Sequence, residues 1–253
     1  MNFTGKKSVL GVLMTAGLML ATLVSPMLCR ASVVISGTRV IYPAAESEVT
    51  IKLSNEGASP ALTQVWVDNG DAKASPTSAA VPFIVTPPLS RIDPHKAQTL
   101  RILYTGESLP QDKESVFWLD VLEIPPKATG ADADANMLQL AFRSRIKLFF
   151  RPGKLQGSVT EAPGQLAWHE SSEGGKPAVS VTNPSAYYVT VASFDLVDNA
   201  GLVLAKSVDT DMVAPGQSKV FPLSAEVKRT GIKVRFNTIN DYGGEDRHEA
   251  VVQ

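Results

Sequence analysis

The chain has 253 residues, with 24 Lys and Arg against 25 Asp and Glu, a net charge of −1. This length allows one or two domains, each large enough to bury a core. The charge balance lacks the basic excess that is typical of nucleic-acid binding, so we expect no nucleic acid as a partner.

Residues 1–31 predict a signal peptide. Two lysines precede an apolar run at residues 9–24, and Cys29-Arg30-Ala31 follows. A basic start, an apolar centre and a final small residue are typical of a secretory leader, cut most simply after Ala31. A membrane anchor needs about 20 apolar residues, and the run at residues 9–24 is short for one. The bulky Leu28 before Cys29 disfavours a lipoprotein, so we expect no membrane insertion after cleavage.

Removal of the leader changes the charge and the redox chemistry of the chain. The leader carries three basic residues and no acidic one, so 21 basic and 25 acidic residues remain, a net charge of −4. Cys29 is the only cysteine, so the exported chain is expected to form no disulfide. Small exported domains often depend on disulfides. We therefore expect this chain to be held together by burial alone.

The first half after the leader predicts β-strands throughout. Apolar, β-branched or alternating segments lie around Arg39 and at 49–53, 62–67, 99–104 and 116–124. Turn signals separate them, among them Thr86-Pro-Pro88 and Asp93-Pro94. Short strands with frequent turns favour a β-sandwich over βαβ units.

The next predicted strand, Asn136–Pro152, is unusually long. Ordinary strands run to about 5–6 residues. One face is apolar: Leu138, Leu140, Phe142, Ile146, Leu148 and Phe150. The other face is basic: Gln139, Arg143, Arg145, Lys147 and Arg151. Side chains alternate along a strand, and an uncovered edge invites pairing with another chain. Either this chain covers the excess, or the edge is the working surface.

The basic face of this strand has two interpretations. The first is the solvated face of an edge strand. The second is an anion site, because Lys and Arg form charge-assisted hydrogen bonds with carboxylate or phosphate. Arg39 is a further basic residue in a strand, and it could instead form an ion pair between strands.

The second half repeats the β pattern. Strands are predicted at 165–169, 178–182, 187–194, 202–205, 218–223 and 232–237. Two immunoglobulin-sized sandwiches fit these lengths. We expect an all-β fold, with domains at 32–152 and 153–253 and a loop at 127–135.

No motif predicts an enzyme. The chain lacks phosphate-loop, dinucleotide-binding, zinc-protease and serine-hydrolase signatures. Its three histidines, His95, His169 and His248, are scattered and read as surface or turn residues. We therefore expect no catalytic residue, no metal and no cofactor.

Several long motifs resemble the periplasmic chaperones of the chaperone–usher pilus pathway. They include Gly37-Thr-Arg-Val-Ile-Tyr-Pro43, the segment 109–126, Ile146-Lys-Leu-Phe-Phe-Arg-Pro152 and Ile239-Asn-Asp-Tyr-Gly-Gly244. They cover essentially the whole chain after the leader, in order. The resemblance implies two immunoglobulin-like sandwiches at an angle, like a boomerang, in a periplasmic protein. It also implies pilus subunits and an outer-membrane usher as partners, with no need for ATP.

The resemblance further implies roles for eight residues. The family's basic pair, which anchors the C-terminal carboxylate of a pilus subunit, is matched by Arg39 and Lys147. The alternating apolar residues of the strand lent to the subunit are matched by Leu138, Leu140 and Phe142. An interdomain salt-bridge cluster is matched by Glu114, Arg151 and Asp241.

Some details depart from the resemblance or leave alternatives. His95 stands where the family usually has Gly, and Phe142 is bulkier than the common Leu or Ile. The short loop at 127–135 resembles the subgroup that serves rod-like pili. The alternatives are a pilus subunit or adhesin, which would be one incomplete sandwich, and a carbohydrate-binding sandwich with exposed aromatic residues. We expect Trp66, Trp118 and Trp168 to pack in cores, against the carbohydrate-binding alternative.

Overall fold

A computed structural model describes residues 32–77, 80–127, 139–227 and 231–253. The predicted leader and the loop at 128–135 lie outside the described residues. In the described part, no helix is long and apolar enough to cross a membrane.

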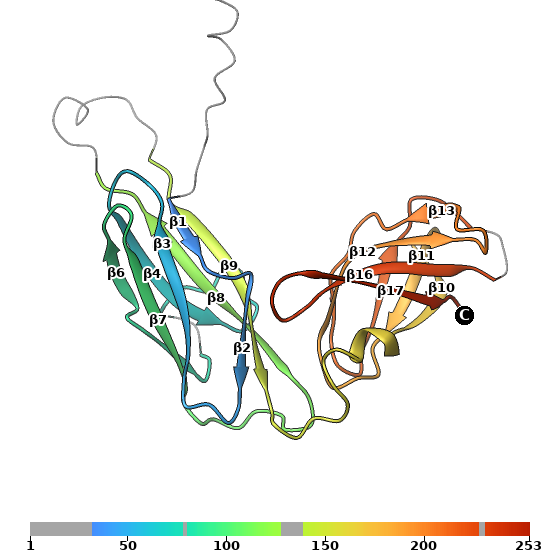
Figure 1. Ribbon diagram of the computed structural model, residues 1–253, viewed down its shortest axis with the longest axis horizontal. Helices are drawn as coiled ribbons and strands as arrows, with labels where there is room; N and C mark the ends of the chain where they lie inside the picture. Colours follow the sequence, from blue (N-terminus) through green and yellow to red (C-terminus); the bar gives the residue numbers. More distant parts are fainter. Residues whose placement is uncertain (1–31, 78–79, 128–138, 228–230) are drawn as a thin grey trace, which may run out of the picture. The chain divides into compact units, whose positions relative to one another are not determined.

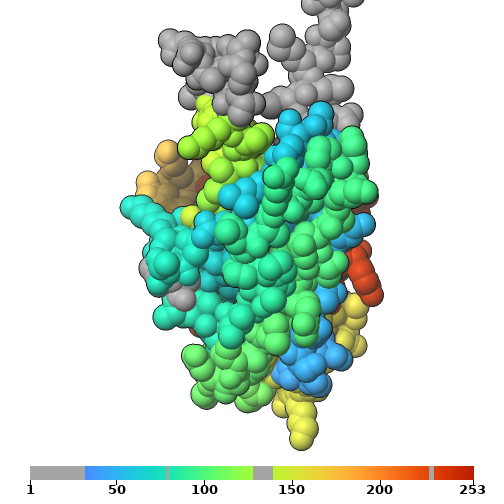
Figure 2. Space-filling model, turned by 90° about the vertical axis from the view of Figure 1, so that its left-hand side faces the viewer, coloured from blue at the N-terminus to red at the C-terminus, as the bar shows by residue number. Residues whose placement is uncertain are grey.

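The first half forms two facing sheets (Figure 1). One sheet has the order β1-β3-β7-β5, with bounds Val33–Ile35, Val49–Asn55, Ala97–Tyr104 and Phe83–Thr86. The other has the order β2-β9-β8-β4-β6, with bounds Arg39–Pro43, Phe142–Arg151, Ser115–Ile124, Ala61–Asp68 and Leu89–Ile92. Figure 2 shows one face of this sandwich, which is covered by side chains of residues coloured blue to green.

The second half also forms two sheets. One has the order β10-β11-β15, with bounds Ala167–Glu173, Lys176–Thr182 and Ser218–Pro222. The other has the order β13-β12-β16-β17, with bounds Val203–Lys206, Val189–Val197, Lys233–Ile239 and Glu245–Val251. β14, Met212–Val213, pairs with β12, and the 3₁₀ helix η2, Ala162–Gln165, precedes β10.

Each half has its own hydrophobic core. Tyr42, Leu119, Leu148 and Phe150 are fully buried in the first. Trp168, Phe194 and Phe236 fill the centre of the second, where their rings contact one another. Alternate strand residues face inward, as expected when two sheets pack face to face. The prediction of an all-β fold with two immunoglobulin-like sandwiches is confirmed, whereas the domain bounds 32–152 and 153–253 stay predictions.

Several strands were not predicted, and β17 shows why. Its sequence, Glu-Asp-Arg-His-Glu-Ala-Val, has no apolar alternation, because most of the strand is exposed at the edge of its sheet. Ion pairs with β16 hold it instead: Glu249 accepts from Lys233 Nζ at 2.7 Å and from Arg235 Nε at 3.3 Å. β5, β6 and β14 were missed because they are short and lie beside turn residues.

The prediction of one strand over Asn136–Pro152 is too long at its start. β9 begins at Phe142, which pairs with Glu123 near the end of β8. β8 ends at Ile124, so within the described residues no strand lies opposite Gln139 and Leu140 to supply hydrogen-bond partners. Leu140 therefore precedes the strand, and Leu138 lies outside the described residues.

Trp168 packs in a core as predicted, whereas Trp66 is buried outside the core cluster and Trp118 is half-buried. Trp66 and Trp118 lie on the face of their sheet that points away from the core, beneath arginine side chains. The guanidinium of Arg143 lies 4.7 Å from the ring centroid of Trp66, and that of Arg145 lies 5.0 Å from that of Trp118. Such cation–π contacts let an aromatic residue be covered without entering a core.

His95 takes the conformation that its place in the turn requires. Its φ is +58°, and Lys96 N donates to Asp93 O at 3.0 Å across the turn. Proline at the second position and positive φ at the third are the signature of a type II turn. Glycine adopts a positive φ more easily than other residues, so the observed φ explains why glycine would be the usual residue at this position and histidine an unusual one.

Candidate functional site

Arg39 and Lys147 stand side by side in the same sheet. β2 and β9 run parallel, and Arg39 is the direct partner of Lys147 in their register. The Arg39 guanidinium lies 5.7 Å from the Phe149 ring centroid, and its Nη1 donates to the carbonyl of Ile239 at 2.9 Å. Its Nε is buried without a hydrogen-bond partner in the described part of the chain. A buried N–H without a partner costs free energy, so this position is suited to an acceptor from a ligand.

The two cations repel each other in a poorly hydrated place. Burial lowers the pKa of Lys147, and the charge of Arg39 lowers it further, while Asp211 acts in the opposite direction. Burial also lowers the pKa of Arg39, against the pull of Asp241 and Glu114. Neither cation has a carboxylate within 4.0 Å in the described ranges. A bound anion would relieve both the repulsion and the cost of burial.

A pocket of about 230 Å³ opens beside this basic pair. Arg39, Phe149, Arg151, Tyr188, Ile239 and Tyr242 are among the residues that line it. Its lining also holds the acids Glu114, Asp241 and Asp246, so the guanidinium of Arg39 is the part of the wall that suits a carboxylate and the aromatic rings are the part that suits an apolar group. Lys147 is not one of the lining residues, so it would meet such a ligand from outside the pocket.

The structure brings Glu114, Arg151 and Asp241 into one cluster. Arg151 Nε donates to Glu114 Oε1 at 2.6 Å, and its two terminal nitrogens donate to the Asp241 carboxylate at 2.6 and 2.9 Å. The second oxygen of Glu114 accepts from Tyr188 N at 2.8 Å. Glu114 and Arg151 belong to the first half and Asp241 and Tyr188 to the second, so the cluster joins residues far apart in the sequence.

The pKa shifts in this cluster follow from burial and pairing. Burial raises the pKa of Glu114, although Arg151 and the Tyr188 amide lower it in part. Burial acts to lower the pKa of Arg151, but Asp241 and Glu114 together raise it above its ordinary value. Arg151 is thus held as a cation, and Glu114 depends on it for its negative charge.

Of the three apolar residues predicted to be lent to a subunit, the two that the structure describes are exposed. Leu140 is 53% exposed and Phe142 is 47% exposed, although both are large apolar residues. β2 pairs with β9 only from Lys147 to Arg151. In the part of the chain that the structure describes, no other strand pairs with residues 142–146 on that side. An apolar row beside a free edge is a surface on which another strand can pair.

The basic face of β9 divides into paired and unpaired residues. Arg143 and Arg145 contact Asp68 and Asp120, and Arg151 contacts Glu114 and Asp241. Of the four basic residues on this face, only Lys147 makes no ion pair with another described residue. The anion-site interpretation therefore narrows to Lys147, with Arg39 beside it.

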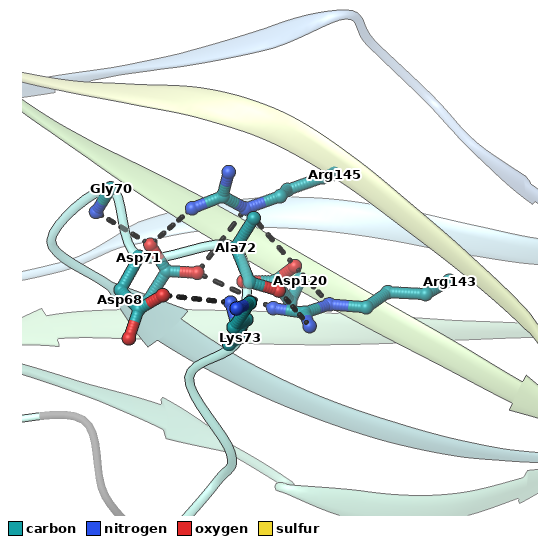
Figure 3. Close-up of polar contacts among 8 residues, drawn as sticks. All are labelled: Asp68, Gly70, Asp71, Ala72, Lys73, Asp120, Arg143 and Arg145. Atoms are coloured by element: carbon teal, nitrogen blue, oxygen red, sulfur yellow. Dashed lines mark hydrogen bonds and ion pairs between the residues drawn. The ribbon is translucent and has the colours of Figure 1, made fainter.

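The network around Asp68 and Asp120 did not emerge from the sequence (Figure 3). Arg143 Nε donates to Asp120 Oδ1 at 2.7 Å and its Nη1 to the Ala72 carbonyl at 2.8 Å. Arg145 donates to both oxygens of Asp68, from Nε at 3.2 Å and from Nη2. Both aspartate side chains are fully buried. Each acid interrupts an apolar strand, which was the one signal available for finding them.

Burial and the close approach of the two acids shift their pKa values in opposite directions. Burial raises the pKa of Asp120 to about 6, and the neighbouring Asp68 contributes to this rise against Arg143. Burial also acts to raise the pKa of Asp68, but hydrogen bonds with Asp120, Arg145 and Gly70 lower it below its ordinary value. Asp68 is thus the member that stays ionised as the pH falls from neutral, and Asp120 is the member that takes up a proton near pH 6.

This network predicts a pH-dependent stability. The pKa of Asp120 rises from 3.8 to about 6 on folding. Its contribution to the free energy of unfolding is therefore fully present below about pH 4 and is lost as the pH rises through 6. We expect wild type to lose stability relative to Asp120→Asn between pH 4 and 6.5 in urea titrations. Asp93→Asn, in an exposed pair with Arg91, controls for the loss of one negative charge. A constant difference between wild type and Asp120→Asn would contradict this assignment.

The histidines do not converge on a site. Among the described residues, no group of three or more His, Cys, Asp or Glu side chains could hold a metal ion. The ring of His248 stacks on Phe236 and bonds to Thr238 Oγ1 at 3.0 Å. These observations supply no candidate for a metal centre.

Two family models match this chain, one over each half. Residues 32–156 match the pili and flagellar-assembly chaperone, PapD N-terminal domain, and residues 161–250 match the pili assembly chaperone PapD, C-terminal domain. The probable fimbrial chaperone YadV of Escherichia coli K12 is 46% identical over 217 residues, 85% of this chain and 87% of that protein. The chaperone protein FimB/FhaD of Bordetella pertussis is 44% identical over 248 residues, 96% of each.

Solved structures show the same fold. The crystal structure of the YadV chaperone has a TM-score of 0.74 and 43% identity, covering 87% of this chain and 100% of that one. The SafB chaperone in complex with Salmonella enterica SafA pilin gives a TM-score of 0.72 and 30% identity, covering 88% and 97%. Because both domain models match in order and relatives are similar along most of its length, this chain belongs to the PapD-like family of pilus-assembly chaperones, whose role is not enzymatic.

Proposed function

We propose that this protein is a periplasmic chaperone that binds pilus subunits through strand β9 and delivers them to an outer-membrane usher without ATP. The observation that carries the proposal is the unpaired cation Lys147, next to Arg39, on the strand that begins at the exposed Phe142 just after the exposed Leu140. A related chaperone has been solved in complex with a pilin. The matches to chaperones over both halves favour this function over a pilus subunit.

The register of β2 and β9 suggests how a subunit strand would lie. β2 occupies the edge of β9 from Lys147 onward and starts at Arg39. A subunit strand on the free edge at residues 142–146 would therefore lie in line with β2. If its C-terminal carboxylate meets Arg39 and Lys147, the strand must run parallel to β9, as β2 does. Its last residue would abut the start of β2.

We call the basic pair Arg39 and Lys147 the carboxylate clamp. The clamp and the apolar row would have different roles in binding a subunit. Leu140 lies seven residues before Lys147, or about 23 Å along an extended chain. Burying each apolar side chain in a subunit groove contributes about 1.5–3 kcal/mol. These contacts do not fix the register by themselves, and a slip of one residue would reverse the faces. A carboxylate held at Arg39 and Lys147 sets the register from one end.

The cluster of Glu114, Arg151 and Asp241 would hold the two halves of the chaperone together. Its carboxylates come from both halves, and one guanidinium bonds to both of them. Bidentate arginine–carboxylate pairs add geometric specificity as well as energy. The cluster would thereby keep the second half in a fixed place beside the clamp.

Leu140→Asp tests the strand that is lent to the subunit. We expect a subunit to bind at least about 10-fold more weakly, because a charge would enter an apolar groove. The stability of the free chaperone should not change, because Leu140 is exposed and precedes β9. Titration calorimetry with a subunit, or with a peptide of its C-terminal strand, measures the affinity.

The neighbouring Gln139 supplies a matched control. It is exposed and of the opposite parity, so Gln139→Asp adds the same charge on the face that would point away from the subunit groove. We expect its affinity to stay within about twofold of wild type. Equal losses for the two variants would show that the charge, and not the apolar row, explains the effect, and the strand assignment would be abandoned.

A further inference from the structure

Glu123 is a buried acid with no cation beside it. It lies near the end of β8, on the same parity as the core residues Leu119 and Val121, and is only 8% exposed. Its Oε1 accepts from Ser32 Oγ and its Oε2 accepts from Val33 N at 3.1 Å. Both donors are neutral. Within the described ranges, no basic side chain lies within 4.0 Å of this carboxylate.

A buried carboxylate without a counter-charge is costly. The residues opposite Glu123 on the neighbouring strands do not supply a counter-charge, because they are Phe142 and Thr63. The backbone N that donates to Ser32 O, at 2.6 Å, belongs to another acid, Glu56. Glu56 adds negative charge to the neighbourhood and does not neutralise Glu123.

The two donors to Glu123 come from the first two residues after the predicted cleavage point, Ser32 and Val33. Ser32 offers its hydroxyl, and the peptide bond that follows it offers Val33 N. The α-nitrogen of Ser32 is attached to the same Cα as the side chain, so it must lie within about 4 Å of this pair of donors. Ser32 is also closely packed: a Cβ at Gly57 would meet Ser32 Cβ at 2.6 Å.

We propose that Glu123 is the binding site for the α-ammonium group that leader cleavage creates on Ser32. The cleavage is a hydrolysis: water adds to the Ala31–Ser32 peptide bond, Ala31 keeps the new carboxylate, and the Ser32 nitrogen leaves as an amine that takes up a proton. Before cleavage that nitrogen is a neutral amide, so the ion pair exists only in the processed chain. The inference rests on the export and cleavage that belong to the proposed function.

This site ties processing to the strand that binds the subunit. Glu123 is the cross-strand partner of Phe142, the first residue of β9. Figure 1 shows β1, the end of β8 and the start of β9 at the same end of the first sandwich. The ion pair would therefore fix the new N-terminus beside the end of β9 from which the exposed apolar row extends.

The first test measures the α-amine of the processed protein. Mass spectrometry establishes whether the secreted chain starts at Ser32, and any other first residue overturns the proposal. The pKa of the amine is then followed by nuclear magnetic resonance. An unpaired α-amine has a pKa of about 7.7–8.0, and pairing with Glu123 should raise it by about one unit. Glu123→Gln should restore the ordinary value, whereas the matched control Glu56→Gln should not.

The second test moves the charge without touching Glu123. Two chains are prepared, one starting at Ser32 and one with a methionine before it, the first released from a tag by a protease that leaves no extra residue. The paired amine has a raised pKa, so its stabilising effect is present below about pH 8 and is lost as the pH rises through the raised pKa. The chain that starts at Ser32 should show this loss and the extended chain should not. Identical pH profiles overturn the proposal.

These tests are independent of subunit binding. Subunit capture by the chain that starts at Ser32 is measured in a separate pull-down. Loss of capture with a paired amine would contradict the proposed function and leave the Glu123 site intact. An ordinary amine with normal capture would contradict the Glu123 site alone. If Glu123→Gln fails to fold, the comparison of the two N-termini still tests the Glu123 site, because both chains keep the native Glu123 side chain.

Discussion

Replacing Lys147 with methionine should weaken subunit binding by about 10- to 150-fold while the chaperone stays folded. A hydrogen bond to a charged group contributes about 1.5–3 kcal/mol, which corresponds to this range of affinities. The fold should tolerate the change, because Lys147 makes no ion pair with another described residue and burial already lowers its pKa. Titration calorimetry measures the affinity, and a thermal melt checks the fold.

A matched lysine and a matched ligand make this test specific. Lys219 contributes to the electrostatics of Lys147 but pairs with Asp211, so Lys219→Met controls for the loss of a nearby positive charge. A subunit peptide with an amidated C-terminus should bind wild type about as weakly as the free acid binds Lys147→Met. Combining the two changes should cause little further loss. If the amide and the acid bind wild type equally well, the clamp does not exist.

The clamp also predicts how affinity depends on pH. The pKa of Lys147 is lowered in the free chaperone, and a bound carboxylate would raise it. Binding therefore takes up a proton once the pH approaches the lowered pKa, and affinity should fall as the pH rises further. The fall should begin below the pKa of about 10.4 of an ordinary lysine. Lys147→Met should lack this alkaline fall.

Replacing Arg151 with methionine should lower the free energy of unfolding by about 3–5 kcal/mol, the typical cost of removing one partner from a buried ion pair. Glu114 would be left buried and negative. Among the described residues, Tyr188 N would be the one remaining hydrogen-bond donor to its carboxylate. Urea denaturation measures the change. Arg101→Met is the matched control, because its pair with Glu48 is exposed to solvent and should contribute little to stability.

Glu114 gives this prediction a second readout. Its folded pKa is raised by burial, so its contribution to stability is present at acid pH and is lost as the pH rises through the raised value. Without Arg151 the pKa should rise further, and the destabilisation should shrink as the pH is lowered. Adding Glu114→Gln to Arg151→Met should recover part of the loss at neutral pH. A loss that is the same at every pH and in the double variant would mean that Arg151 acts through packing alone.

The sequence by itself determined the fold class and which residues carry charge or apolar surface on β9. Alternation has a period of two along a strand, so Leu140 and Phe142 could be assigned to one face and Arg143, Arg145 and Lys147 to the other before any contact was known. The family motifs named Arg39, Glu114 and Asp241 in addition, although nothing in their spacing predicts that they approach these strands.

Only the tertiary structure decided which of these residues are free. Arg143 and Lys147 look alike in the sequence, but Arg143 contacts Asp120 from the neighbouring strand, whereas the register partners of Lys147 are Trp118 and Arg39, neither of which is an acid. The length of β9 was likewise set by where β8 ends. Pairing between distant segments depends on register and on partner strands, and local alternation carries no information about either. For the same reason the meeting of Glu123 with Ser32, 91 residues away, became visible only in the folded chain.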